Sequence, residues 1–134
     1  MHRLPILLLP FLLLAACAPI EPVTPPPGTD VRLDGTSILG AWNAIGAPDQ
    51  ADVDTDLRRG VLTRMLVFNP YGRVTLSGHD RRAGGGSTSF EGRLRGDSVT
   101  FEGLSGTARL ALRDRNTMVL TDPGGNRTVY RRSR

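Results

Sequence analysis

The sequence predicts an all-β domain, a small antiparallel up-and-down barrel of about eight strands. Short runs alternate apolar and polar residues, turn residues separate these runs at nearly regular spacing, and each run has one apolar face. An open sheet of such strands would expose that face and two edges, whereas closure into a barrel buries the face and removes the edges. Strands are expected at residues 38–45, 61–68, 73–77, 90–95, 98–102, 108–113, 117–121 and 127–131.

The alternation is clearest between residues 73 and 113, where apolar side chains fall on every second position. The positions that share the apolar face are Val74 and Leu76, Phe90 and Leu94, Val99 and Phe101, and Ala108, Leu110 and Leu112. Asn, Asp, Pro and Gly occupy the gaps at 69–72, 95–97, 103–106, 114–116 and 123–126, and these residues favour tight turns. The pattern therefore indicates a meander of hairpins.

Two segments depart from the strand pattern. Residues 47–60 contain Pro48, four Asp and the pair Arg58-Arg59, which indicates a loop or a short helix across one end of the barrel. Residues 79–87 contain three consecutive glycines, so we expect a mobile loop there.

The amino-terminal residues have the architecture of a secretory signal. Arg3 supplies a positive charge, and the apolar run 4–14 that follows is too short to span a membrane as a helix. Leu14-Ala15-Ala16-Cys17 then resembles the lipobox of bacterial lipoproteins, in which the cysteine is acylated and becomes the new amino terminus. The resemblance implies that acyl chains on Cys17 hold the protein in a lipid bilayer. The alternative is an ordinary signal peptide with Cys17 near its cleavage site by chance.

The lipobox interpretation divides the chain into three parts. Residues 1–16 form the signal peptide, 17–30 the lipidated cysteine with a proline-rich tether, and 31–134 the barrel domain. Five prolines within 18–28 favour an extended polyproline conformation that would hold the domain away from the bilayer. Ala18 follows the cysteine in place of the Asp typical of inner-membrane retention, so the resemblance implies the periplasmic face of the outer membrane.

The basic charge of the chain consists entirely of arginine, with 17 Arg and no Lys. Residues 79–134 carry most of the surplus of Arg over acidic residues. An exported, tethered protein has little access to nucleic acid, so we expect no nucleic-acid partner. A solvated surface, or contact with an anionic lipid or an acidic envelope protein, is the expected use of this charge.

The start of the first predicted barrel strand carries a second resemblance. Gly40-Ala41-Trp42 is similar to the Gly-x-Trp signature of lipocalins and related calycin barrels, and to the start of the bacterial Inh-type protease-inhibitor barrels. The resemblance implies that Trp42 plugs the closed barrel end and stacks on a late arginine, Arg127 or Arg131. The domain is shorter than a typical lipocalin, and Cys17 leaves no cysteine for the disulfide often found in Inh-type inhibitors.

A barrel of eight strands has an interior that side chains fill or that holds one small ligand. The short domain favours a shallow or filled cavity, and if the interior is not filled, a small apolar molecule is the ligand expected at the open end. The candidate interior residues are Trp42, Met65, Phe90, Phe101, Leu110 and Arg127.

Candidate catalytic and metal-binding patterns are weak. His79 and Asp80 with Ser77 or Ser87 supply the residue types of a hydrolytic triad, but neither serine lies in a G-x-S-x-G turn. The acidic alternation at 52–56 lacks the glycine and the glutamate of an EF-hand, and the expected reading is an acidic helix start. We expect no catalytic residue, no metal and no cofactor.

Three classes of function remain open. The first is a non-catalytic, membrane-anchored module that binds an envelope protein or a small apolar molecule. The second is an Inh-type protease inhibitor, and the third is a small hydrolase that uses His79. An open apolar pocket would favour ligand binding, whereas a packed interior with a protruding arm at 31–36 would favour inhibition or docking.

Overall fold

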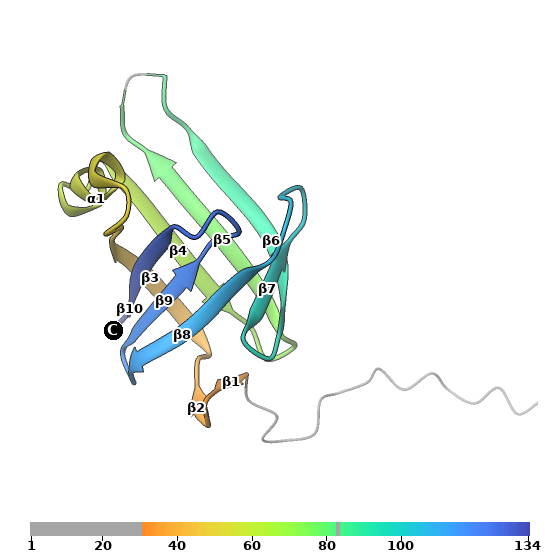
Figure 1. The fold of residues 1–134 in the computed structure, drawn as a ribbon. Helices are drawn as coiled ribbons and strands as arrows, with labels where there is room; N and C mark the ends of the chain where they lie inside the picture. Colours follow the sequence, from red (N-terminus) through yellow and green to blue (C-terminus); the bar gives the residue numbers. More distant parts are fainter. Residues whose placement is uncertain (1–30, 83) are drawn as a thin grey trace, which may run out of the picture.

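The computed structural model describes residues 31–82 and 84–134. The signal peptide, the lipobox with Cys17 and the proline-rich tether, all predicted within residues 1–30, lie outside the described residues. The described chain folds as a closed antiparallel β-barrel with one short helix (Figure 1). The predicted fold class, an all-β barrel of eight strands, is confirmed.

A small hairpin precedes the barrel strands, and one helix interrupts them. The elements are β1 (Arg32–Leu33), β2 (Thr36–Ser37), β3 (Gly40–Gly46), α1 (Ala51–Arg58), β4 (Leu62–Phe68), β5 (Arg73–Asp80), β6 (Ser87–Arg95), β7 (Ser98–Phe101), β8 (Ala108–Asp114), β9 (Thr117–Thr121) and β10 (Arg127–Arg132). Within the described residues, no helix is long and apolar enough to cross a membrane.

The barrel closes because the last strand pairs with the first. The order around it is β10-β3-β4-β5-β6-β7-β8-β9, with β9 pairing back to β10, and each neighbouring pair is antiparallel. Neighbours in the barrel are therefore also neighbours in the chain, apart from the closure of β10 on β3. This is the up-and-down connection that consecutive hairpins predict.

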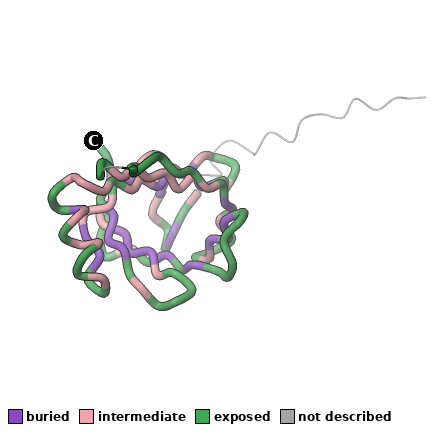
Figure 2. Tube along the Cα trace, turned by 90° about the horizontal axis from the view of Figure 1, so that it is seen from above, coloured by how far each residue is buried: buried purple, intermediate pink, exposed green. Residues whose placement is uncertain are grey.

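The strand register assigns alternate residues to the inside and the outside of the barrel. Leu66 pairs with both Trp42 and Leu76, and Leu76 pairs with Phe90, so these four side chains share the inner face. Viewed from above, the strands form a ring (Figure 2). The buried hydrophobic cluster comprises Leu33, Ile38, Trp42, Leu66, Phe68, Val74, Val99, Phe101, Ala108, Leu110, Met118, Leu120 and Tyr130.

One end of the barrel is sealed around Trp42. Its indole is fully buried, and its Nε1 donates a hydrogen bond to the Ile38 carbonyl oxygen at 3.0 Å. The β1–β2 hairpin lies at this end, and Leu33 of β1 and the neighbouring Ile38 are buried in the core (Figure 1). Residues 31–36, considered above as a protruding arm, are therefore packed against the barrel through Leu33.

The arginine that stacks on Trp42 is Arg132, not Arg127 or Arg131. The Arg132 guanidinium carbon lies 4.3 Å from the ring centroid, and the two residues are paired in the β10–β3 register. Arg131 pairs with Asn43 and is exposed, so it faces outward. Arg127 and Arg131 both lie on the outward phase of β10, whereas Arg132, one residue beyond the predicted end of the strand, follows Thr128 and Tyr130 on the inward phase.

The opposite end carries α1 and the β5–β6 loop (Figure 1). Asp54 of α1 accepts the Ala47 backbone N–H at 2.8 Å and the Arg58 Nε–H at 2.8 Å, which ties the helix to the end of β3. Asp49 accepts hydrogen bonds from the backbone N–H, Nε and Nη2 of Arg127 at the start of β10. Hydrogen bonds thus attach the segment at residues 47–60 to the end of β3 and to the start of β10.

The loop predicted at residues 79–87 is shorter than expected. β5 continues to Asp80 and β6 begins at Ser87, so His79 and Ser87 are paired strand residues. Polar side chains cover the outer face of these strand ends, and apolar alternation therefore did not reveal them.

Candidate ligand site at the open end of the barrel

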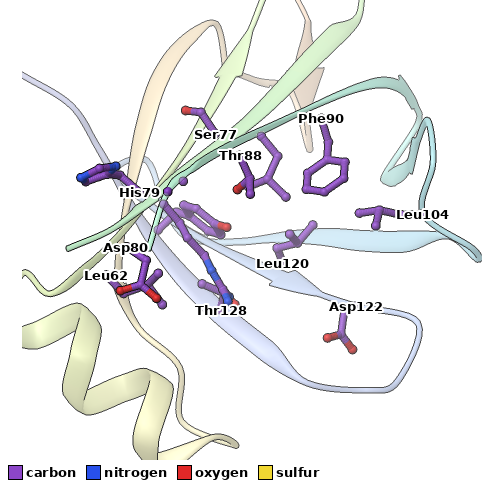
Figure 3. A pocket seen from close by; sticks show the side chains of 15 residues that line it. Leu62, Ser77, His79, Asp80, Thr88, Phe90, Leu104, Leu120, Asp122 and Thr128 are labelled. Atoms are coloured by element: carbon purple, nitrogen blue, oxygen red, sulfur yellow. The ribbon is translucent and has the colours of Figure 1, made fainter. Parts of the chain in front are cut away.

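A cavity of about 420 Å³ opens into the barrel at the end that carries α1 and the β5–β6 loop. Leu76, Phe90, Leu120 and Tyr130 line its apolar part, and they come from β5, β6, β9 and β10. Figure 3 shows Thr88, Phe90, Leu104 and Leu120 directed toward this space. Its volume falls within the range of small-molecule pockets, about 300–1,000 Å³.

The barrel is hollow at this level because small residues occupy inward positions. Gly78 pairs with Arg64 on one side and Thr88 on the other, so no side chain projects inward between them. Thr128 of β10 is another short inward residue lining the cavity. Toward Trp42, by contrast, Leu66, Phe68, Val74 and Met118 fill the interior.

A smaller cavity of about 90 Å³ adjoins the first and extends toward β7 and β8. Both cavities share Leu76, Leu104, Leu120 and Asp122, so they adjoin each other around these side chains. Leu104 is 44% exposed and lines both cavities. The walls of both cavities are mostly apolar.

Of the two carboxylates at the mouth, Asp80 is paired with an arginine and Asp122 is exposed to solvent. Asp80 accepts hydrogen bonds from Nε and Nη2 of Arg82, and these bonds hold the pKa of the Asp80 carboxyl below its usual value. Arg82 also lies 3.0 Å from Asp56 of α1, which links the rim of the cavity to the helix. Asp122 accepts the Asn126 backbone N–H and is exposed to solvent.

Tyr130 brings a phenol into the deep part of the cavity. The residue is 1% exposed, and this burial raises the pKa of Tyr130 to about 12, with the positive charge of Arg64 acting in the opposite direction. The hydroxyl therefore remains protonated, and able to donate a hydrogen bond, throughout the ordinary pH range.

The residues predicted for the interior are distributed over three levels. Phe90 lines the main cavity, and Phe101 lines the smaller one. Leu110 is 3% exposed within the packed core and lines neither cavity. Trp42 is fully buried at the sealed end and lines neither cavity.

Met65 and Arg127 were expected in the interior, and both lie elsewhere. Met65 pairs with Asn43 and Ser77, one residue out of phase with the inward Leu66, and therefore lies on the outer face. Arg127 is exposed and held by Asp49 at the α1 end of the barrel.

His79 and Ser87 meet on the outer surface of the barrel. His79 Nδ1 and Ser87 Oγ are 3.0 Å apart, which is hydrogen-bond distance. Asp80 follows on the inward phase and pairs with Leu62, so its carboxylate is directed away from the imidazole. In residues 31–82 and 84–134, no carboxylate hydrogen-bonds to the His79 ring, so a catalytic triad is not assembled.

The acidic residues on α1 take part in ion pairs and helix contacts. Asp54 binds Arg58, and Asp56 lies beside Arg82. Among the described residues, no group of three or more His, Cys, Asp or Glu side chains has the arrangement of a metal site.

A scan against protein-family models, a search of curated proteins and a search of solved structures each give no match for this chain. The cavity is therefore interpreted from its own residues.

The sequence interpretation missed Arg64, Gly78, Thr88 and Tyr130. One signal was present, because Arg64 stands at an inward position between the apolar residues Leu62 and Leu66. A lone charged residue in the apolar phase of a strand indicates either a pairing partner or a functional opening.

Proposed function

We propose that this protein is a non-catalytic, membrane-anchored binding module of the bacterial cell envelope that takes a small apolar molecule into the open end of its barrel. The observation that carries the proposal is the cavity of about 420 Å³ with an apolar floor of Leu76, Phe90 and Leu120. Burial of apolar ligand surface in such a space supplies about 25 cal/mol per Å².

The sealed end of the barrel supports the same proposal. Leu33 is 5% exposed, so the segment at 31–36 is engaged with the core rather than extended toward a protease. This arrangement favours ligand binding over the Inh-type inhibitor, which needs a free segment to enter an active site. The inhibitor alternative predicts that the protein slows a secreted bacterial protease at stoichiometric concentration.

The proposed anchor is compatible with an accessible cavity. Val31, the first described residue, lies at the sealed end, opposite the cavity (Figure 1). The chain that follows a lipidated Cys17 would therefore join the domain at the end remote from the opening, and the opening would stay free for a ligand.

A binding measurement tests the proposed function. Phenylnaphthylamine, a neutral apolar fluorophore, should gain fluorescence on titration with the full chain, and Thr88→Trp should abolish the gain by filling the mouth. Ser89→Trp is the matched control, because Ser89 lies next along β6 and pairs with the outward Ser77. Equal binding to all three proteins, or binding to none, would contradict the proposal.

A labelling experiment tests the proposed anchor. Cells expressing the protein should incorporate radiolabelled palmitate into it, and Cys17→Ser should abolish the label and release the protein from the membrane fraction. Wild-type protein that carries no label, or a labelled Cys17→Ser variant, would show that the proposed lipidation is wrong.

The contact between His79 and Ser87 supports a second candidate, a small hydrolase. The 3.0 Å separation of His79 Nδ1 and Ser87 Oγ meets the geometric requirement for a base and a nucleophile. Turnover of p-nitrophenyl acetate by the wild type, lost in both Ser87→Ala and His79→Gln, would establish this function. Equal rates for the wild type and the two variants would eliminate it.

A further inference from the structure

Arg64 is a basic side chain on the inner face of the barrel that has no carboxylate partner within the described residues. Its register with the inward positions Gly78 and Thr88 and its place in the cavity lining direct it into the opening. Arg82 and Arg127, by contrast, are each held by an aspartate. No hydrogen bond or ion pair to the Arg64 guanidinium occurs in residues 31–82 and 84–134.

The Tyr130 hydroxyl is a second polar group without a partner in the same cavity. Tyr130 is 1% exposed and lines the cavity, and within the described part of the chain its hydroxyl makes no hydrogen bond. Among the described side chains, no polar atom is both fully shielded from solvent and without a hydrogen-bond partner. Because the Tyr130 hydroxyl has no partner, its oxygen must be accessible from the cavity. Arg64 is near enough for its charge to act on the phenol.

We propose that the cavity binds a single-chain amphiphile with a carboxylate head group, with Arg64 and Tyr130 donating hydrogen bonds to the carboxylate. This inference rests on the proposed function and names the class of ligand for the same site. A planar guanidinium matches the two oxygens of a carboxylate, and a neutral phenol supplies one further donor.

The rest of the cavity suits the tail of such a molecule. Leu76, Phe90 and Leu120 line the main space, and the smaller cavity adjoins it beside Leu104. Arg64 is half-buried and has no anionic partner among the described residues. An anion that binds beside it supplies that partner and leaves its chain in contact with the apolar walls. A neutral apolar molecule would leave Arg64 and Tyr130 without partners.

Neither of the two carboxylates at the mouth, Asp80 and Asp122, is an ion-pair partner of Arg64. Asp80 is directed to Arg82, with Nη2 to Oδ2 at 2.8 Å. Asp122 is exposed at the rim, where water screens its charge, and its Oδ1 accepts the Asn126 backbone N–H at 2.9 Å.

Calorimetric titration with decanoate, decanol and acetate separates the head group from the tail. The full chain carrying Cys17→Ser, which removes the proposed acylation site, serves as the reference protein at about pH 8, where decanoate is ionised. We expect decanoate to bind about tenfold to a hundredfold more tightly than decanol, because a hydrogen bond to a charged group adds to the burial of the chain. Acetate should not bind, because it lacks the chain.

Three variants on this reference assign the effect to the two residues. Arg64→Met should weaken decanoate binding by about tenfold or more and leave decanol binding unchanged, and Tyr130→Phe should weaken decanoate binding severalfold. Arg93→Met is the matched control, because Arg93 is an exposed arginine on the outer face of β6. Circular dichroism and thermal melts verify that each variant is folded.

The outcomes separate this inference from the proposed function. If decanol and decanoate bind equally and Arg64→Met changes neither, the apolar cavity function stands and the carboxylate assignment is overturned. If neither ligand binds the reference protein, both proposals fail. A loss of decanoate affinity in Arg93→Met as large as that in Arg64→Met would also overturn the assignment, since it would indicate a general charge effect.

Discussion

At the residue scale, the sealed end depends on Arg132 and Trp42. The Arg132 guanidinium stacks on the indole, and its Nη2 donates to the carbonyl oxygens of Ser37 at 2.8 Å and Arg115 at 3.0 Å. One side chain thus joins the β1–β2 hairpin, the β8–β9 turn and the carboxyl-terminal strand.

Removing the contact between Arg132 and Trp42 should lower the stability of the fold. Arg132→Met should reduce the free energy of unfolding by about 2 kcal/mol, because it loses a cation–π contact and leaves backbone carbonyls unpaired. Urea denaturation measures the loss. Arg131→Met, an exposed neighbour on the same strand, should change stability by less than about 0.5 kcal/mol, and an equal effect of both substitutions would show that the stacking contributes nothing.

Residues 61–68 show why a residue-level prediction succeeds or fails. Apolar side chains occur on both faces of this strand, since Leu66 and Phe68 are inward and Met65 and Val67 outward. Alternation therefore could not set the phase, and a slip of one residue exchanges the two faces. The assignment of Met65 to the interior failed for this reason, and Arg64 was overlooked for the same reason.

At the element scale, the close packing of β6 against β7 depends on Gly92, which lies beside the buried ring of Phe101. Gly92 is a buried inward residue paired with Phe101, and a Cβ there would lie 2.7 Å from Phe101 Cδ1 and 2.8 Å from the Thr100 carbonyl oxygen. The missing side chain therefore lets the β7 backbone and the Phe101 ring approach β6 closely.

A single methyl group at this position should disturb the barrel. Gly92→Ala should destabilise the fold by about 1–3 kcal/mol, because the Thr100 carbonyl belongs to the backbone and cannot rotate away. Thermal unfolding measures this loss. Gly86→Ala is the control, because a Cβ there would meet no atom within 4 Å; a comparable loss in the control would contradict the packing explanation.

Element boundaries followed from turn chemistry better than from apolar alternation. The strands at 117–121 and 98–101 lie where the sequence indicated them, since turn residues flank both. The extension of β5 to Asp80, the start of β6 at Ser87 and the β1–β2 hairpin were not predicted. Their pairing depends on backbone hydrogen bonds between polar residues, which leave no periodic apolar signal.

At the scale of the whole molecule, the two barrel ends differ in construction. Trp42 and the β1–β2 hairpin fill one end, whereas the other end is open and is bordered by α1, which ion pairs attach to the barrel. The Arg127–Asp49 pair joins segments that are 78 residues apart in the chain. The sequence predicted closure and either a loop or a short helix at one end, but it could not predict which inward residues leave space.

The ion pairs around α1 make the molecule sensitive to acid. Hydrogen bonds from Arg127 lower the pKa of Asp49 to about 2, and the Ala47 backbone N–H lowers the pKa of Asp54. Because folding depresses these pKa values, the stabilisation is complete above the unfolded value of 3.8 and is lost as the pH falls toward 2. Urea midpoints should therefore fall between about pH 5 and pH 2.

A variant assigns part of this acid sensitivity to one pair. Asp49→Asn should lower the midpoint at about pH 5 and flatten its decline toward pH 2, because the amide carries no charge to lose. Asp34→Asn, at an exposed turn, should leave the profile unchanged. Parallel profiles for the wild type and Asp49→Asn would contradict the role given to this pair.

We propose that the open end of the barrel takes an apolar chain. Nuclear Overhauser contacts between bound decanoate and the protein test it most directly. We expect contacts from the decanoate chain to Leu76, Phe90 and Leu120 inside the cavity. Contacts confined to outward residues such as Met65, or no contacts at saturating decanoate, would contradict it.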